Sequence, residues 1–119
     1  MEKEFVDYKI GLELNELGFD EPCFAWHVSE KYGLEFGKVI QSNLIGDAVV
    51  APTYSQAFRF FRENFGLCQI VIQNTDKDWT YEVWAITGIT YYEILDVLDK
   101  YEECEIACLK KLIEIVKEK

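Results

Sequence analysis

Hydrophobic positions spaced three and four residues apart predict three helices, and the first of them covers Tyr8–Leu17. Asp7 precedes this helix and is its expected N-cap, because a short carboxylate accepts hydrogen bonds from the N–H groups of the first turn. Gly18 then occupies the left-handed position of a Schellman stop, with Phe19 folding back toward Leu14. The chain is therefore expected to leave this helix through a tight turn.

The second predicted helix begins at a capping box and ends at a glycine. Thr53 is its expected cap, Gln56 lies three residues later as the capping-box partner, and Gly66 ends the helix. The residues of its apolar face recur at helical spacing: Ala57, Phe58, Phe61 and Phe65. Local signals thus mark both ends of this helix.

The third predicted helix is the longest and runs from Lys100 to Lys117, with Asp99 as its cap and Glu102 as the box partner. Its expected buried stripe is Ile106, Leu109, Ile113 and Val116, with Cys104, Cys108 and Leu112 at the edges. Acidic residues crowd its start and lysines lie toward its end, which complements the helix dipole. These charges have a structural explanation and do not indicate a binding patch.

Four strand-like stretches lie between the helices and predict two hairpins. Cys23–Val28 and Leu34–Gln41 flank one turn, and Leu67–Gln73 and Trp79–Thr87 flank another. A further stretch, Tyr91–Leu95, is either a short fifth strand or a loop.

The order of elements is therefore α-β-β-α-β-β-α, with residues 43–51 as an irregular connection. We expect an α+β fold with one antiparallel sheet of four strands, or five, and helices packed mainly on one face. A small residue stands three positions after a tyrosine at each helix start, namely Gly11, Ala57 and Cys104. This recurrence either reflects a duplicated α-β-β unit or the convergence of helix starts, and it allows close approach to the sheet.

Composition and length indicate one folded domain covering residues 1–119. The chain has a mass of 13.9 kDa, half of its residues are hydrophobic, and it contains eight Phe, seven Tyr and three Trp. This composition excludes a disordered chain. No apolar run approaches the roughly 20 residues that span a bilayer, so we expect no membrane segment.

The charge balance is strongly acidic, with 22 Asp and Glu against 12 Lys and Arg and a net charge of −10. This balance disfavours nucleic-acid binding, because the phosphate backbone attracts basic proteins, and it favours a basic protein partner instead. The first residues, Met1 to Glu4, show no signal-peptide pattern, so the cytoplasm is the expected location.

The four cysteines, Cys23, Cys68, Cys104 and Cys108, are expected to be free buried thiols in a reducing compartment. Cys104 and Cys108 share one helical face and, with His27, form the alternative of three soft zinc ligands. The spacing lacks the Cys-x-x-Cys knuckles of zinc sites, so packing is the preferred interpretation. We expect no metal and no cofactor.

Catalytic patterns are weak in this sequence. His27 is the single histidine and lies in an apolar run, where a half-buried histidine with a satisfied hydrogen bond is the expected state. No nucleophile elbow, phosphate loop or dinucleotide fingerprint is present. We therefore assign no catalytic residue, and an enzymatic activity is unsupported.

One sheet face is expected to lack helical cover and to carry large apolar groups. It includes Trp84 and either Phe24 and Trp26 or the opposite set of the first hairpin. Aromatic groups dominate interface energetics, so this face is a candidate contact surface. The alternative is cover by a loop, either 43–51 or 87–95. Self-association through this face makes a homodimer the expected oligomer.

A small-ligand site is the second interpretation of the same residue types. The residues that would stack on a ring or an apolar group are Trp26, Trp84, Tyr91 and Tyr92. Arg59, Arg62 and Lys38 are candidate partners for an anion, and Arg59 and Arg62 are one helical turn apart. An ordinary solvated helix face is the alternative for the two arginines.

Three motifs resemble a known group. They are the stretch from Gly18 to Ala25 (GFDEPCFA), the stretch from Ala51 to Arg62 (APTYSQAFRFFR), and the stretch from Tyr101 to Glu105 with its following helix. Together they cover about half of the chain and are similar to short uncharacterised proteins of phages, prophages and mobile elements of gut Bacteroidetes, whose members tend to have Ala in place of Cys104. The resemblance implies a shared fold and a mobile-element origin, and it transfers no activity.

The sequence therefore predicts an accessory protein of mobile-element type that acts as a non-enzymatic protein-binding module. Its expected partners are a second copy of itself and a basic host or phage protein. The alternative is a small-ligand-binding protein with a pocket at the seam between sheet and helix or at a dimer seam.

Overall fold

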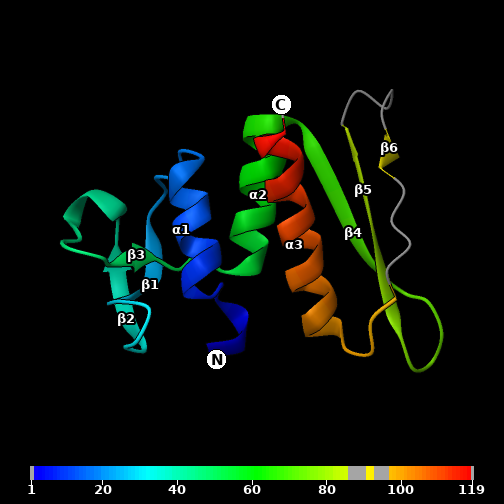
Figure 1. Cartoon of the computed structure of the whole chain (residues 1–119), viewed down its shortest axis with the longest axis horizontal. Coiled ribbons are helices and arrows are strands. Elements are labelled where there is room, and N and C mark those ends of the chain that lie inside the picture. Colours follow the sequence, from blue (N-terminus) through cyan, green and yellow to red (C-terminus); the bar gives the residue numbers. More distant parts are fainter. Residues whose placement is uncertain (1, 86–90, 93–96, 119) are drawn as a thin grey trace. The chain divides into compact units, whose positions relative to one another are not determined.

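The computed structural model describes residues 2–85, 91–92 and 97–118. The chain divides into two compact units, Met1–Ala57 and Phe58–Lys119, and the division falls inside helix α2 (Tyr54–Phe65). Each unit contains its own sheet and its own helix packed on that sheet (Figure 1). A single domain over residues 1–119 stays a prediction.

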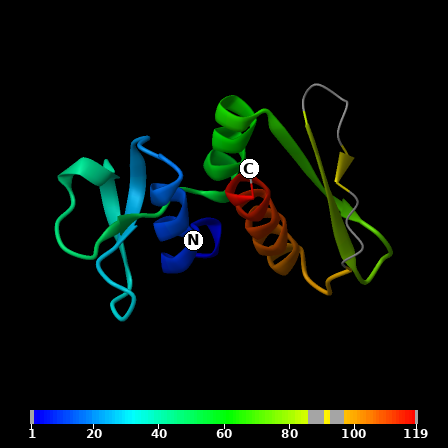
Figure 2. The ribbon, with the colours of Figure 1, turned by 45° about the horizontal axis from the view of Figure 1, so that its top comes forward.

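The first unit holds helix α1 (Tyr8–Glu16) and a three-stranded antiparallel sheet. Its strands are β1 (Cys23–His27), β2 (Leu34–Val39) and β3 (Val49–Val50), in the spatial order β2-β1-β3. Two short 3₁₀ turns, η1 (Glu2–Glu4) and η2 (Gln41–Asn43), complete it. Strand β1 therefore has a neighbour on both sides, as Figure 2 shows.

The predicted ends of α1 are confirmed. The Asp7 carboxylate accepts a hydrogen bond from the Ile10 N–H at 2.9 Å, as an N-cap does. At the other end, the Phe19 N–H donates to the Leu14 carbonyl at 3.0 Å, and Gly18 has a φ of 95°. This is the Schellman geometry, and it leads the chain directly into the loop before β1.

Gly11 explains how α1 lies so close to β3. A Cβ atom at this position would stand 2.8 Å from the Val50 carbonyl oxygen and 3.3 Å from a methyl group of Val49. Only a residue without a side chain permits this separation. The predicted close approach of a small residue is therefore confirmed at Gly11.

The second unit holds strands β4 (Leu67–Gln73), β5 (Trp79–Ala85) and β6 (Tyr91–Tyr92) and helix α3 (Tyr101–Lys117). The strands are antiparallel in the order β4-β5-β6, and α3 packs against β4 and β5. The predicted second hairpin is confirmed over its described residues, and residues 86–87 of its second strand lie outside them. Of the two alternatives for Tyr91–Leu95, residues 91–92 form a strand, whereas residues 93–95 lie outside the described part.

The α+β class, the three helices and the antiparallel pairing are confirmed, but the prediction of one sheet is wrong. The first hairpin pairs with β3, a two-residue strand within the stretch 43–51 that was expected to be irregular. The second hairpin pairs with β6 instead. Because each hairpin takes its third strand from its own unit, the structure contains two three-stranded sheets.

The predicted cap of α3 is wrong. Lys100, not Asp99, occupies the N-cap position, and it makes no side-chain capping hydrogen bond. Two backbone hydrogen bonds of 2.7 and 2.8 Å pair Leu98 with Trp79 of β5, so the chain is still extended at Leu98 and needs two further residues to turn. Glu102, three residues after Asp99, therefore cannot form a capping box with it.

The buried face of α3 is rotated relative to the prediction. Its buried residues are Cys104, Cys108, Leu109, Leu112, Ile113 and Ile115, whereas Ile106 and Val116 are only half-buried. The two cysteines thus belong to the centre of the core and not to its edge. Small side chains there let α3 lie close to its sheet.

The predicted cap of α2 is confirmed, but its capping box is not. The Gln56 N–H donates to the Thr53 hydroxyl at 3.1 Å. The Gln56 side chain, however, donates to the Pro22 carbonyl at 2.8 Å instead of returning to the Thr53 backbone. This contact ties the start of α2 to the loop before β1. Gly66, with a φ of 65°, ends the helix as predicted.

Candidate functional site

The exposed side of β1 carries large apolar side chains. Cys23 and Ala25 are fully buried, whereas Phe24 between them is 67% exposed and Val28 at the strand end is 42% exposed. Since neighbouring side chains of a strand point to opposite faces, Phe24 belongs to the face that α1 does not cover. This decides which of the two predicted sets faces outward.

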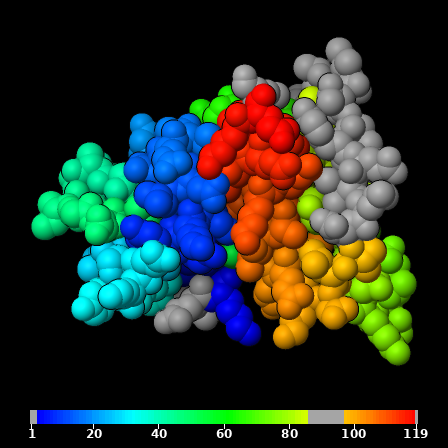
Figure 3. All heavy atoms as spheres, in the orientation of Figure 1, coloured from blue at the N-terminus to red at the C-terminus, as the bar shows by residue number. Residues whose placement is uncertain are grey.

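Trp26 lies on the same outward side and is half-buried. Its indole packs on the neighbouring strand, where a Cβ at Gly37 would stand 3.3 Å from the ring. Trp26 is also the register partner of Glu35 on β2. We call Phe24, Trp26 and Val28 the outer hairpin face. Figure 3 shows the adjoining turn and β2, in cyan, at the surface of the first unit.

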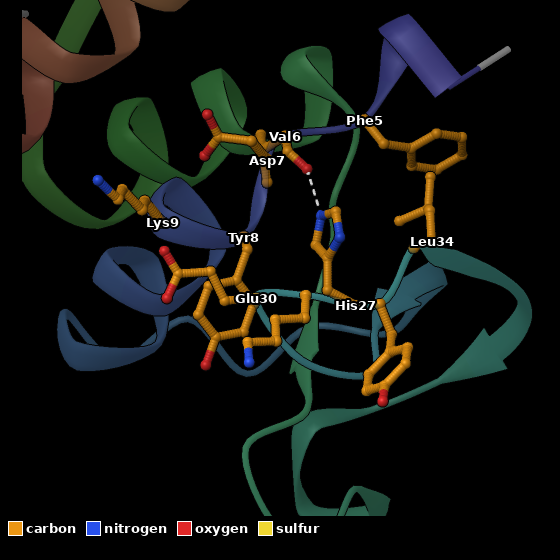
Figure 4. Close-up of a pocket in the computed structure, with 11 residues that line it drawn as sticks. Phe5, Val6, Asp7, Tyr8, Lys9, His27, Glu30 and Leu34 are labelled. Atoms are coloured by element: carbon orange, nitrogen blue, oxygen red, sulfur yellow. Dashed lines mark hydrogen bonds between the residues drawn. The ribbon is translucent and has the colours of Figure 1, made fainter.

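The first unit also contains a cleft of about 490 Å³, between the start of α1 and the turn that joins β1 to β2. Its lining comes from two segments, 5–9 and 27–34: Phe5, Val6, Asp7, Tyr8, Lys9, His27, Glu30, Lys31, Tyr32, Gly33 and Leu34. Figure 4 shows the His27 ring between the Tyr8 ring on one side and Phe5 and Leu34 on the other. The cleft therefore combines aromatic walls with one imidazole.

The hydrogen bond of His27 determines its tautomer. Its Nε2 atom lies 2.8 Å from the Val6 carbonyl oxygen, and a carbonyl only accepts, so Nε2 carries the hydrogen. In the neutral ring, Nδ1 is then an unprotonated acceptor, and it has no hydrogen-bond partner among the described residues. The predicted half-buried, hydrogen-bonded His27 is confirmed.

Other polar groups of the cleft hold its walls in place. The Tyr8 hydroxyl donates to the Asp47 carbonyl at 3.0 Å, and its ring meets the His27 ring edge-on with centroids 6.2 Å apart. On the opposite segment, the Tyr32 N–H donates to the Ser29 hydroxyl at 3.3 Å and steadies the turn. Tyr8 therefore presents its ring to the cleft while its hydroxyl is used for structure.

The predicted contact residues fall into both units. Trp26 lies in the first unit, and Trp84, Arg59, Arg62, Tyr91 and Tyr92 lie in the second. Trp84 is half-buried and pairs in register with Tyr91, while Arg59 and Arg62 are exposed on α2. The structure describes the side chains of four of them, Trp26, Trp84, Arg59 and Arg62, and none of these four lines the cleft.

Sequence reasoning missed Phe5, Tyr8 and Tyr32 as cleft residues. Tyr8 was interpreted only as a helix start, and Tyr32 only as part of a turn. No local pattern in the sequence marks these rings as neighbours of His27. The distance of about twenty residues between the two segments concealed that they meet.

Burial disfavours the thiolate form of two of the cysteines. It raises the pKa of Cys23 to about 12, with Glu21 adding to the rise, and it raises the pKa of Cys108 to about 12, with Cys104 and Glu105 adding to the rise. All four cysteines are free. Within the described residues, no three metal-binding side chains lie close enough to hold an ion, and His27 belongs to a different unit from Cys104 and Cys108.

Comparison with known proteins adds no relative to these observations. No protein-family model, no curated protein and no solved structure matches the chain. The mobile-element origin therefore stays a prediction. No helix in the described part of the chain is long and apolar enough to cross a membrane.

Proposed function

We propose that this chain is a non-enzymatic protein-binding module that engages its partner through the outer hairpin face. One observation carries the proposal: Phe24 is 67% exposed on a strand whose next position, Ala25, is fully buried. Exposed aromatic groups next to a half-buried tryptophan are typical of interface centres, where burial of an aromatic ring contributes strongly to binding.

The charge of the first unit indicates a basic partner. Residues 1–57 contain ten carboxylates and four lysines, which gives a net charge of −6. Two copies meeting through this unit would bring like charges together, whereas a basic protein would be attracted. The proposed partner is therefore a host or phage protein with a basic surface around an apolar centre. The predicted homodimer is the alternative to this partner.

The test compares two alanine variants during capture of partners from cells of the encoding organism. Phe24→Ala removes the exposed ring of the outer hairpin face, and Leu12→Ala removes a 37% exposed side chain from α1 as the matched control. We expect Phe24→Ala to weaken retention of a basic protein by at least about tenfold, and Leu12→Ala to leave it unchanged. Retention should also fall as salt rises. Equal retention by both variants would contradict the proposal.

Small-ligand binding is a second candidate function, and the cleft at His27 favours it. The cleft has a volume in the range of ligand sites, and three aromatic side chains line it together with His27 and four charged residues. It lies between the start of α1 and the turn that joins β1 to β2.

A further inference from the structure

We infer that the cleft at His27 binds an uncharged planar heteroaromatic ring, and that a ring N–H of this ligand donates a hydrogen bond to His27 Nδ1. The inference rests on the second candidate function, small-ligand binding, and specifies its ligand class. Nucleobases, indoles and benzimidazoles belong to this class.

The need for a donor follows from the tautomer of His27. The Val6 carbonyl holds the hydrogen on Nε2, at a distance of 2.8 Å, so Nδ1 offers a lone pair. His27 lines the cleft, and no described residue donates to Nδ1. A ligand that places an N–H against Nδ1 would satisfy this acceptor, whereas an acceptor atom there would be repelled.

The aromatic walls of the cleft favour a planar ligand. Phe5, Tyr8 and Tyr32 all line the cleft, and the Tyr8 ring already meets His27 edge-on. Aromatic walls favour a flat ligand through stacked or edge-to-face contacts. Tyr32 is 69% exposed, so its ring has most of its surface left to cover a ligand.

The charged residues at the cleft favour a ligand without net charge. Two lysines, Lys9 and Lys31, are balanced by two carboxylates, Asp7 and Glu30. In Figure 4, Lys9 extends away from His27, and Glu30 lies beside Tyr8. The surrounding unit has a net charge of −6. The cleft itself supplies no excess of positive charge to a phosphate, and the negative charge of the unit opposes its approach, which favours the free base over the nucleotide.

The experiment uses pairs of probes in which a methyl group replaces the hydrogen of the ring N–H: indole against 1-methylindole, and benzimidazole against 1-methylbenzimidazole. Adenine and AMP test the charge argument. Binding is measured by NMR titration of the full chain, with the ¹⁵N shift of His27 Nδ1 as a direct readout. We expect the N–H compounds to shift Nδ1 and to bind at least about tenfold more tightly than the methylated compounds.

A comparison of two variants in the same hairpin tests whether the probes bind in the cleft. Tyr32→Ala and Phe24→Ala each remove an aromatic ring of similar exposure, 69% and 67%. Tyr32→Ala should weaken binding at least about tenfold, and Phe24→Ala should leave it unchanged. His27→Phe keeps an aromatic ring at this position but has no acceptor in place of Nδ1, so it should equalise the affinities within each pair of probes.

The outcomes separate the two claims. Equal binding of methylated and N–H probes, or tighter binding of AMP than of adenine, would overturn the ligand class and leave a small-ligand site standing. Equal loss in Phe24→Ala and Tyr32→Ala would overturn the assignment to the cleft. The lack of any binding up to the solubility limit of every probe would overturn both the inference and the second candidate function.

Discussion

At the scale of single residues, Glu105 shows how burial and hydrogen bonding compete at one carboxyl group. Its half-buried position on α3 raises the pKa of the carboxyl, a hydrogen bond with the Tyr101 hydroxyl lowers it, and the charge of Glu102 raises it further. The net direction is upward from 4.5. The folded state therefore binds this proton more readily than the unfolded state.

The sign of this shift predicts a pH dependence of stability. Because the folded pKa lies above the unfolded one, the penalty of burying the charge is present at neutral pH and disappears as the pH falls below about 4.5. Glu105→Gln should therefore raise the Tm at pH 7 relative to wild type, and this advantage should vanish at low pH. Thermal unfolding between pH 4 and pH 8 measures it.

Glu103→Gln is the matched control for this prediction. It removes an exposed negative charge from the same end of α3, so any effect of the helix dipole is shared by both variants. An equal Tm change in the two variants at every pH would show that burial of Glu105 has no specific role.

Burial also predicts which thiols react in the native protein. Cys23, Cys104 and Cys108 are buried, and the pKa of Cys23 and of Cys108 is raised to about 12, whereas Cys68 is half-exposed on β4. A disulfide reagent that reports released thiolate should therefore label Cys68 rapidly and the other three only on unfolding. Cys68→Ser should abolish the rapid phase. A rapid phase that persists in this variant would contradict the burial of the core thiols.

At the scale of elements, the packing of α1 on β3 depends on the missing side chain of Gly11. Gly11→Ala would place a Cβ 2.8 Å from the Val50 carbonyl oxygen, a backbone atom that cannot rotate away. We expect a loss of about 1–3 kcal/mol in unfolding free energy, even though alanine ordinarily favours a helix over glycine. Denaturant titration measures it.

Gly33→Ala is the control, because a Cβ at Gly33 meets nothing within 4 Å. Its expected effect on the unfolding free energy is neutral or slightly stabilising, through the reduced entropy of the unfolded chain. A Gly11→Ala variant as stable as Gly33→Ala would show that α1 and β3 are not in close contact.

The elements that the sequence predicted well are those specified by local signals. Asp7 and Gly18 mark the ends of α1 through hydrogen bonds within a few residues, and the same holds for Thr53 and Gly66 around α2. The cap of α3 was misplaced because Leu98 is held by Trp79, a residue nineteen positions away. A two-residue strand such as β3 carries too short a pattern to be recognised.

At the scale of the whole molecule, the number of sheets depends on which strands pair, and the sequence pattern did not specify this pairing. A hairpin exposes two edges, and nothing in its alternation states which other segment will pair with them. Here β1 pairs with β3 and β5 pairs with β6, so two sheets replace the expected one. The same limit applies to the cleft, which forms only because residues 5–9 meet the turn after β1.

The outer hairpin face was foreseen as one of two alternatives. Alternation placed Phe24 and Trp26 on one side and Cys23 and Ala25 on the other, but only the position of α1 shows which side is covered. With that position known, the 67% exposure of Phe24 becomes the main evidence for a partner.

The most direct test of that partner is site-specific photocrosslinking in cells of the encoding organism. A benzophenone amino acid is introduced at position 24 of the outer hairpin face and, as the control, at position 12 on α1. We predict one discrete crosslinked product from position 24, containing a basic protein, and none from position 12. A product of twice the chain's own mass would show that the partner is a second copy of the chain and not a basic protein. No discrete product from position 24, or the same product from both positions, would contradict the outer hairpin face as a binding surface.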